Sequence, residues 1–166
     1  MKKVILKART KINNIDFKKL NEINDMKLNF ENISKIKILL NKQIIELGKV
    51  FSIKVISTES KRNEIIINGC NKYCNFLGYE WKRDKLIVNS DVGLNVGARM
   101  ISGEIYVKGS VDDFLGAEMS GGFLHVSENA KNRVLCTLFR QPLKNKKILA
   151  GIFAKNGEII ELFESK

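Results

Sequence analysis

The sequence predicts a mainly β protein built around a parallel β-helix with about 19 residues per coil, a length typical of solenoid repeats. Two observations carry this prediction. Residues recur at a fixed step, as in the series Val88, Val107 and Val126. Apolar residues also alternate with other residues at the start of each repeat, which is the pattern of a half-buried strand. In a solenoid each repeat buries its apolar face against the next.

The repeats begin at Glu64, and their inward positions should stack into ladders of like residues. The predicted ladders are Leu86, Ile105 and Leu124; Val88, Val107 and Val126; Val96 and Leu115; and Met100 and Met119. Each buried aliphatic side chain stabilises a fold by about 1.5–3 kcal/mol. The ladders alone can therefore explain the repeat, and three short β segments are expected in each coil.

Five glycines recur at spacings of 6, 6, 7 and 6 residues, and we expect them where a coil turns a corner. They are Gly97, Gly103, Gly109, Gly116 and Gly122. Corners often need a positive φ or a close approach of two backbones. The spacing does not match a phosphate-binding glycine loop followed by a helix, so these glycines are assigned a structural role.

The first coil is longer than the others, because the step from Ile67 to Val88 exceeds the step from Val88 to Val107 by two positions. The two extra positions fall in the turn CNKYC, between Gly69 and Gly78. We expect this turn to bulge from the solenoid without breaking the stack.

Both flanks are expected to be short and rich in β structure. Residues 1–60 are interpreted as a lead-in segment, residues 61–140 as the repeats and residues 141–166 as a cap. Strands are expected at 4–8, 35–40, 43–47 and 50–56, and a short amphipathic helix is expected at 15–23. The pair Asn156-Gly157 between apolar runs predicts a β-hairpin that covers the last coil.

The net charge of +11 is concentrated in the flanks, because residues 1–60 hold 13 Lys/Arg against 6 Asp/Glu while residues 61–126 hold 8 of each. The flanks lack an arginine-rich run and an aromatic stripe, so we expect no nucleic-acid partner. No stretch is apolar enough to cross a bilayer, and the N-terminal run VIL is too short for a signal peptide. Three cysteines fit a reducing compartment, so the expected location is cytoplasmic with no membrane partner.

Cys70 and Cys74 form a C-x3-C pair, Cys136 is distant, and His125 is the single histidine. A zinc or iron–sulfur site would need more ligands at suitable spacing. We interpret the thiols as buried or incidental and predict no metal-binding and no cofactor-binding residue in this chain.

Catalytic alternatives are also weak. His125 could act as a base beside Ser120 or Ser127, but the sequence has no GxSxG turn. The pair Asp112-Asp113 lies in a coil turn, where neighbouring carboxylates are ordinary. We therefore predict no catalytic residue.

The outward row of the repeats, defined as Ile66, Ile87, Tyr106 and His125, is the candidate partner face. Three of its four members are apolar or aromatic on a face that should otherwise be polar. Such a patch usually marks a protein interface. The alternative is that the N-terminal segment of the same chain covers it.

The pattern GxxVGAxMxxGEIxVxG at residues 93–109 resembles the glycine-repeat domain shared by two protein families. One is the C subunit of formylmethanofuran dehydrogenase, and the other is the C-terminal domain of glutamate synthase large subunits. The segment DDFLGAEMSGGFLHVSENA and the run IIELGKVFSIKV at residues 44–55 look most like the former.

The resemblance implies a right-handed parallel β-helix that serves as a non-catalytic structural subunit in one-carbon metabolism, as in archaeal methanogenesis. Its partners would be the other subunits of an oxidoreductase complex, which hold a molybdenum or tungsten pterin and iron–sulfur clusters. This chain has about three and a half coils, fewer than the family usually has. A stand-alone interaction or assembly protein that keeps the glycine-repeat fold is the alternative.

Overall fold

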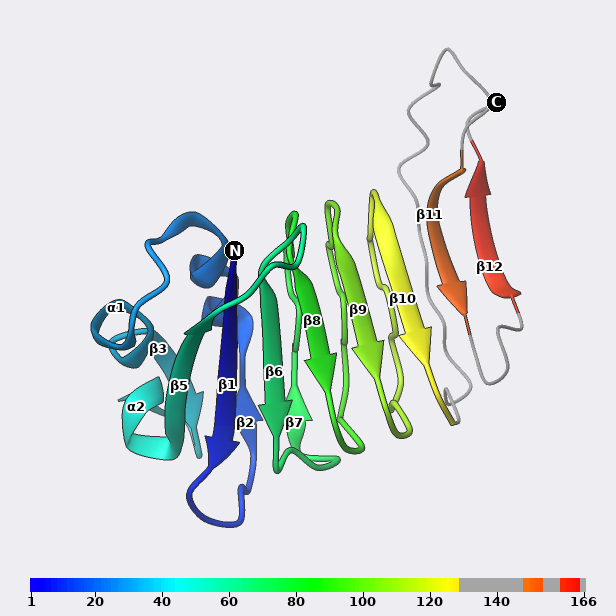
Figure 1. The fold of residues 1–166 in the computed structure, drawn as a ribbon. Coiled ribbons are helices and arrows are strands. Elements are labelled where there is room, and N and C mark those ends of the chain that lie inside the picture. The colour runs from blue at the N-terminus through cyan, green and yellow to red at the C-terminus, as the bar shows by residue number, and fades with distance from the viewer. Residues whose placement is uncertain (129–147, 154–158, 165–166) are drawn as a thin grey trace.

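The protein is mainly β, as the computed structural model shows for residues 1–128, 148–153 and 159–164. Its larger sheet has eight strands in the order β12-β11-β10-β9-β8-β6-β1-β5 (Figure 1). The strands are β1 (Lys2–Ala8), β5 (Phe51–Ser57), β6 (Glu64–Asn68), β8 (Lys85–Val88), β9 (Glu104–Val107), β10 (Gly122–Val126), β11 (Ile148–Phe153) and β12 (Ile159–Glu164).

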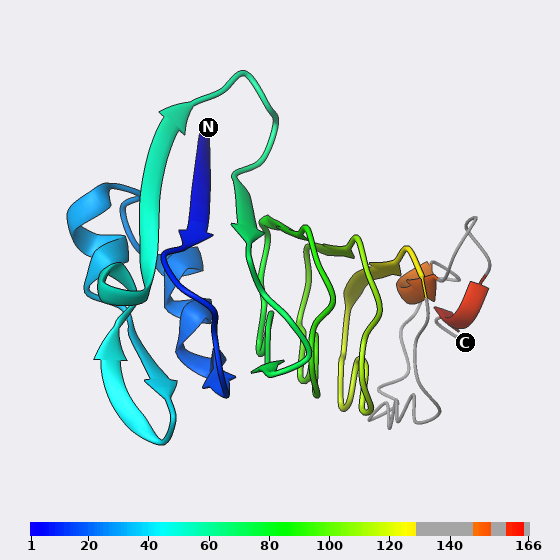
Figure 2. The same ribbon diagram turned by 90° about the horizontal axis from the view of Figure 1, so that it is seen from below.

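The repeats place like residues side by side. Strands β6, β8, β9 and β10 pair in parallel and in register, so that Ile67 faces Val88, Val88 faces Val107, and Val107 faces Val126. Seen from below, the coils follow one another as a row of similar loops (Figure 2). The predicted inward ladders are confirmed, because every one of their members is at most 1% exposed.

The remainder of each coil differs from the expected three β segments. Beyond the strand, coils two and three are joined by an isolated bridge between Val92 and Val111. A turn follows in which Asn95, Gly97 and Arg99 all have positive φ. Alternating left-handed residues cannot form an extended strand. The coils are still linked there by backbone hydrogen bonds, such as the one from the Gly97 N–H to the Leu77 carbonyl at 2.8 Å.

The five glycines expected at coil corners fall into two kinds. Positive φ values occur at Gly97, Gly103, Gly116 and Gly122. Gly109 lies outside that region, but a Cβ built on it would be 2.6 Å from the backbone nitrogen of Asp91 in the coil before. Position 109 therefore needs glycine because a side chain would not fit between the stacked coils, and not because the backbone is left-handed.

A second sheet of four strands lies at the N-terminal end in the order β4-β3-β2-β7. Its strands are β2 (Ile15–Asp16), β3 (Lys37–Leu40), β4 (Gln43–Glu46) and β7 (Cys74–Asn75). The two-residue turn between β3 and β4 has positive φ at both Asn41 and Lys42, as tight hairpins require. Phe17, just after β2, packs against Phe51 of the larger sheet with ring centroids 5.8 Å apart, so the core continues between the two sheets.

The helix expected at residues 15–23 is only partly correct. Its first residues form β2, and a 3₁₀ helix, η1 (Lys18–Asp25), follows. The reason is pairing across the chain: the N–H of Ile15 donates to the Tyr73 carbonyl at 2.9 Å and that of Phe17 to the Asn75 carbonyl at 3.0 Å. Two further short helices, α1 (Phe30–Ser34) and α2 (Leu47–Val50), complete the segment.

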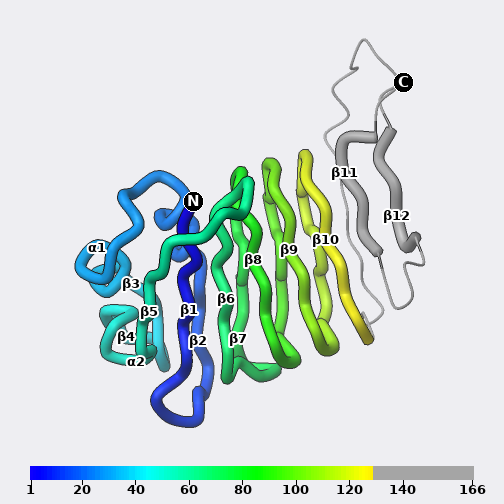
Figure 3. The backbone as a smooth tube through the Cα atoms, viewed as in Figure 1, coloured from blue at the N-terminus to red at the C-terminus, as the bar shows by residue number. Residues whose placement is uncertain are grey.

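The expectation that the CNKYC turn bulges from the solenoid without breaking the stack holds only for its tip, where Lys72 and Tyr73 are exposed. The two ends of the turn are buried. Cys70 is 7% exposed and Cys74 is fully buried. The turn contains β7, which pairs in parallel with β2, and the two strands lie behind β1 and β6 in the backbone trace (Figure 3). The longer turn of the first coil therefore holds the lead-in segment on the repeats.

The two strands of the expected C-terminal hairpin are present. Strand β11 pairs in parallel with β10 and antiparallel with β12, so the hairpin covers the edge of β10 that the coils leave unpaired. The turn residues 154–158, including Asn156-Gly157, lie outside the described residues, as does Cys136. No helix in the described part of the chain is long and apolar enough to cross a membrane.

Candidate functional site

The outward row follows the middle of the larger sheet from β6 to β10. Ile66 faces Ile87, Ile87 faces Tyr106, and Tyr106 faces His125 across neighbouring strands. All four side chains are half-buried, whereas the residues on either side of them in β8 and β9 are fully buried. The row is therefore continuous over four adjacent strands on the outer side of the sheet.

The lead-in segment extends the sheet beside this row. Strand β1 pairs with β6 in the same sheet, and Ile5 faces Ile66. Ile5 is also half-buried, so the apolar row gains a fifth member. The next residue in this direction is Lys54 on β5, which faces Ile5 and is exposed.

The two aromatic members of the row are stacked. The Tyr106 and His125 rings lie 4.3 Å apart between centroids and are 3° from parallel. The Lys85 ammonium lies 4.4 Å from the centroid of the Tyr106 ring, within the range of a cation–π contact. The Tyr106 hydroxyl donates to Oε2 of Glu104 at 3.1 Å, which fixes the ring on its own strand.

Burial sets the ionisation of both rings. Burial is the main cause that lowers the pKa of His125, with Lys85 acting in the same direction and Glu104 in the opposite one. Burial is also the main cause that raises the pKa of Tyr106, and the neighbouring Glu104 adds to it. Both rings are thus held in their neutral forms, which favours contact with an apolar surface.

Charged side chains flank the outward row, and most of them are basic. The lysines that alternate onto this side are Lys3, Lys7, Lys54, Lys85 and Lys108. The acids are Glu64, which pairs with Lys3 at 3.4 Å, and Glu104, which pairs with Arg62 at 3.0 Å. The face therefore has an apolar centre and a predominantly basic rim.

The other residues considered for chemistry are engaged elsewhere. The thiols of Cys70 and Cys74 interact with each other: their hydrogen bond is the main cause that raises the pKa of Cys70 and lowers the pKa of Cys74. The Ser120 hydroxyl donates to the Met100 carbonyl at 3.4 Å. Within the described ranges, no three His, Cys, Asp or Glu side chains are grouped so that they could hold a metal ion.

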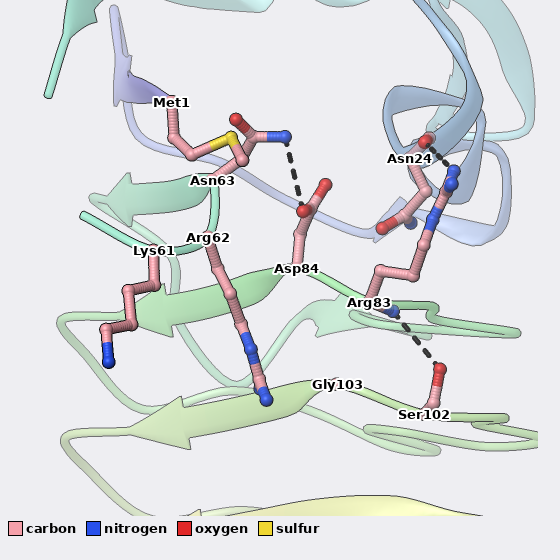
Figure 4. Close-up of a pocket in the computed structure, with 9 residues that line it drawn as sticks. All are labelled: Met1, Asn24, Lys61, Arg62, Asn63, Arg83, Asp84, Ser102 and Gly103. Carbon is pink, nitrogen blue, oxygen red and sulfur yellow. Dashed lines mark hydrogen bonds between the residues drawn. The ribbon is translucent and has the colours of Figure 1, made fainter. Parts of the chain in front are cut away.

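The structure also contains a pocket of about 570 Å³ where the lead-in segment meets the first two coils. We call it the seam pocket. Its lining includes Asn24 from η1, Lys61, Arg62 and Asn63 from the loop before β6, and Asp84 before β8 (Figure 4). Ser102 and Gly103 of the next coil close one side.

Sequence reasoning missed the seam pocket. From the sequence, residue 60 ends the lead-in segment and residue 61 begins the repeats, and neither Asn24 nor Asp84 is assigned a role. Asn24 and Asp84 are far apart in the sequence, and they line one pocket because η1 follows β2, which pairs with β7 of the first coil, and because Arg83 donates to the Asn24 carbonyl. The one available signal was the repeat step from Asp84 to Gly103, which places both at equivalent positions of adjacent coils.

Comparison with known proteins gives one informative result. No protein-family model matches the sequence, and no curated protein matches it significantly. Among solved structures, the chain is similar to a chain of the formyltransferase/hydrolase complex FhcABCD from Methylorubrum extorquens, determined by X-ray crystallography with bound methylofuran. The TM-score is 0.66 at 21% sequence identity.

The match covers 90% of this chain and 54% of the other chain. This chain therefore spans about half the length of its structural neighbour. At this identity the likeness concerns the fold, and the fold in question occurs in a chain of a multi-subunit complex.

Proposed function

We propose that this protein is a non-catalytic structural subunit, or a shortened paralogue of one, in a complex that handles formylated furan cofactors. In this proposal the coils form a right-handed parallel β-helix in the cytoplasm, and the outward row docks on a partner subunit. Reactive groups, including any pterin or iron–sulfur cluster that the family resemblance implies, would belong to the partners.

The observation that carries the proposal is the continuous apolar row on a fold that recurs in a multi-subunit complex. Ile66, Ile87 and Tyr106 are half-buried neighbours on a rigid sheet, and rigid elements position an interface better than loops do. Because the rim is basic, the expected partner surface has an apolar centre with carboxylates around it. Electrostatic complementarity of this kind favours the correct partner and raises its association rate.

Purification of the tagged chain from its native cells tests this proposal. We expect a formyl-transferring or hydrolysing subunit, identified by mass spectrometry, to co-purify in a fixed ratio. Ile87→Glu and Tyr106→Glu should each weaken this association at least tenfold, about 1.4 kcal/mol. Ile44→Glu is the matched control, because Ile44 is 74% exposed on β4 in the other sheet.

Two results would overturn the proposal. One is that both glutamate variants of the outward row associate as well as the Ile44 variant. The other is that no subunit of the stated class co-purifies with the wild-type chain.

A stand-alone assembly protein that keeps the same fold is the second candidate, because the likeness to the neighbouring chain concerns the fold and not its contacts. Sedimentation equilibrium of the native, untagged protein separates the two candidates, because a monomer or homo-oligomer at cellular concentration supports the second and a hetero-complex supports the first.

A further inference from the structure

The floor of the seam pocket holds a carboxylate that is fixed in place. Asp84 is 7% exposed. Its Oδ1 accepts from the side-chain amide of Asn63 at 3.2 Å, and its backbone carbonyl accepts from the indole of Trp81 at 2.8 Å. No side chain among the described residues donates to Oδ2, and Figure 4 shows this oxygen on the side of Asn24. An acceptor is therefore available before any ligand arrives.

A second acceptor lies in the same wall. Asn24 is 7% exposed, and its side-chain oxygen is buried without a hydrogen-bond partner. Its amide nitrogen donates to the Asn21 carbonyl at 3.1 Å, and its own backbone carbonyl accepts from Arg83 at 2.6 Å. Leaving a buried acceptor unpaired is unfavourable. The wall formed by Asn24 and Asp84 is thus rich in acceptors and short of donors.

Cations occupy the mouth of the pocket. Lys61 is exposed and makes no ion pair with any other residue that the structure describes. The Arg62 side chain is 55% exposed and pairs with Glu104 at 3.0 Å. Arg83 is held at two points, because its Nη2 lies 3.0 Å from Oδ1 of Asp25 and donates to the Asn24 carbonyl at 2.6 Å. Arg62 has a single exposed ion pair that a ligand can replace, so Lys61 and Arg62 are the groups that can bind an anion.

We propose that the seam pocket binds a small zwitterion of the amino-acid type. Its ammonium group binds Asp84, and its carboxylate binds Lys61 and Arg62. The Asp84 carboxylate would repel a purely anionic ligand, and the two basic side chains would repel a purely cationic one. The volume of about 570 Å³ lies within the range of roughly 300–1,000 Å³ that is usual for ligand pockets. This inference does not depend on the docking proposal.

Amino acids of graded length provide a direct test. Binding of glycine, β-alanine, 4-aminobutyrate and 6-aminohexanoate to the full chain is measured by titration calorimetry and NMR at pH 7.5. Acetate and methylammonium serve as probes with one charged group each. We expect one length to bind at least fivefold more tightly than either single-charge probe, because only the right length reaches both ends of the pocket.

Variants of the wall and the mouth complete the test. Asp84→Asn and Lys61→Ala should each weaken the best amino acid at least fivefold. Lys61 is exposed, so its replacement leaves the fold intact even if the Asp84 variant folds poorly. Lys11→Ala, which removes an exposed lysine outside the pocket lining, is the matched control and should bind as the wild type does.

The proposal is overturned if acetate or inorganic phosphate binds as tightly as every amino acid, since the site would then be an anion site. It is equally overturned if methylammonium or Mg²⁺ alone accounts for the binding, if no probe binds, or if the Lys61 variant behaves as Lys11→Ala does. None of these results changes the expected behaviour of the outward row in co-purification.

Discussion

The rings of Tyr106 and His125 lie parallel to within 3° and 4.3 Å apart between centroids, one coil above the other. The two residues are direct register partners on β9 and β10. The stack therefore follows from the sequence repeat itself, which places an aromatic residue at the same outward position in two successive coils.

This stack should contribute measurably to stability. A double-mutant cycle with Tyr106→Ala and His125→Ala should give a coupling free energy of about 0.5–1.5 kcal/mol, measured by urea unfolding, as aromatic pairs commonly do. Ile66 and His125 lie on strands that are not neighbours, so their alanine variants should be additive within about 0.5 kcal/mol. Additivity at the Tyr106–His125 pair would mean that the stacked geometry is energetically neutral.

Stability should depend on pH through His125. Burial lowers the pKa of His125 in the folded protein below its ordinary value of 6.5. Between the lowered pKa and 6.5 the unfolded chain binds more protons than the folded one, so the free energy of unfolding falls as the pH drops through this window. Above 6.5 this effect is absent.

His125→Gln isolates this contribution, because the chain has one histidine. We expect the difference in unfolding free energy between wild type and variant to be constant above pH 6.5. Below pH 6.5 the wild type should become less stable relative to the variant. An NMR titration of the imidazole gives the pKa directly. A value at or above 6.5 would contradict the lowered pKa.

The buried ladder of large side chains should dominate stability. Trp81 and Met100 occupy equivalent positions in the first two coils and are fully buried. Trp81→Ala should cost about 3–5 kcal/mol and Met100→Ala about 2–5 kcal/mol in urea unfolding, since both leave cavities. Ile101→Ala is the control beside them, because Ile101 is 47% exposed and surface changes usually stay within about 0.5 kcal/mol.

Position 97 should reject a side chain. Gly97 has a φ of +65°, and a Cβ built there would lie 2.7 Å from Cδ2 of Leu124. Gly97→Ala should cost about 1–3 kcal/mol through backbone strain, measured as a fall in the urea midpoint at constant slope. Asn95 has a φ of 60° two residues earlier, and Asn95→Gly should be nearly neutral because glycine adopts this conformation readily.

The thiols of the first coil should be protected from reagents. Cys74 is fully buried and Cys70 is 7% exposed, so their reaction with a disulfide dye should be at least 100-fold slower in the folded protein than in urea. A Cys136→Ser background removes the third thiol. Fast reaction without denaturant would mean that β7 separates from β2 in solution.

The ladders could be predicted because their signal is local and periodic. Leu86, Ile105 and Leu124 follow one another at the repeat step, and their burial follows from stacking alone. The hairpin β3–β4 could also be predicted from the sequence, because its two turn residues separate two apolar runs. In both cases the residues that interact are near one another in sequence or related by a fixed step.

The errors concern contacts without such a signal. The start of the expected helix at residues 15–23 forms β2 because it pairs with β7, which lies much later in the chain, within the first coil. Nothing in the local pattern of Ile15 and Asp16 reveals that partner. The acceptor wall of the seam pocket is similar, since Asn24 lies beside Asp84 through the pairing of β2 with β7 and through the bond from Arg83 to the Asn24 carbonyl.

The pairing of β7 with β2 limits how the coil number can change. Among the described residues, contacts from the lead-in segment and the loop before β6 reach Arg83, Asp84 and Glu104, which lie in the first coils. A duplication of residues 104–122 would insert one whole coil beyond those contacts and would keep an identical Glu104 for Arg62. The longer first coil carries β7 and cannot be copied in this way. The fold therefore combines one anchored coil with others whose number can vary, so the outward row can lengthen or shorten by one member with each coil gained or lost.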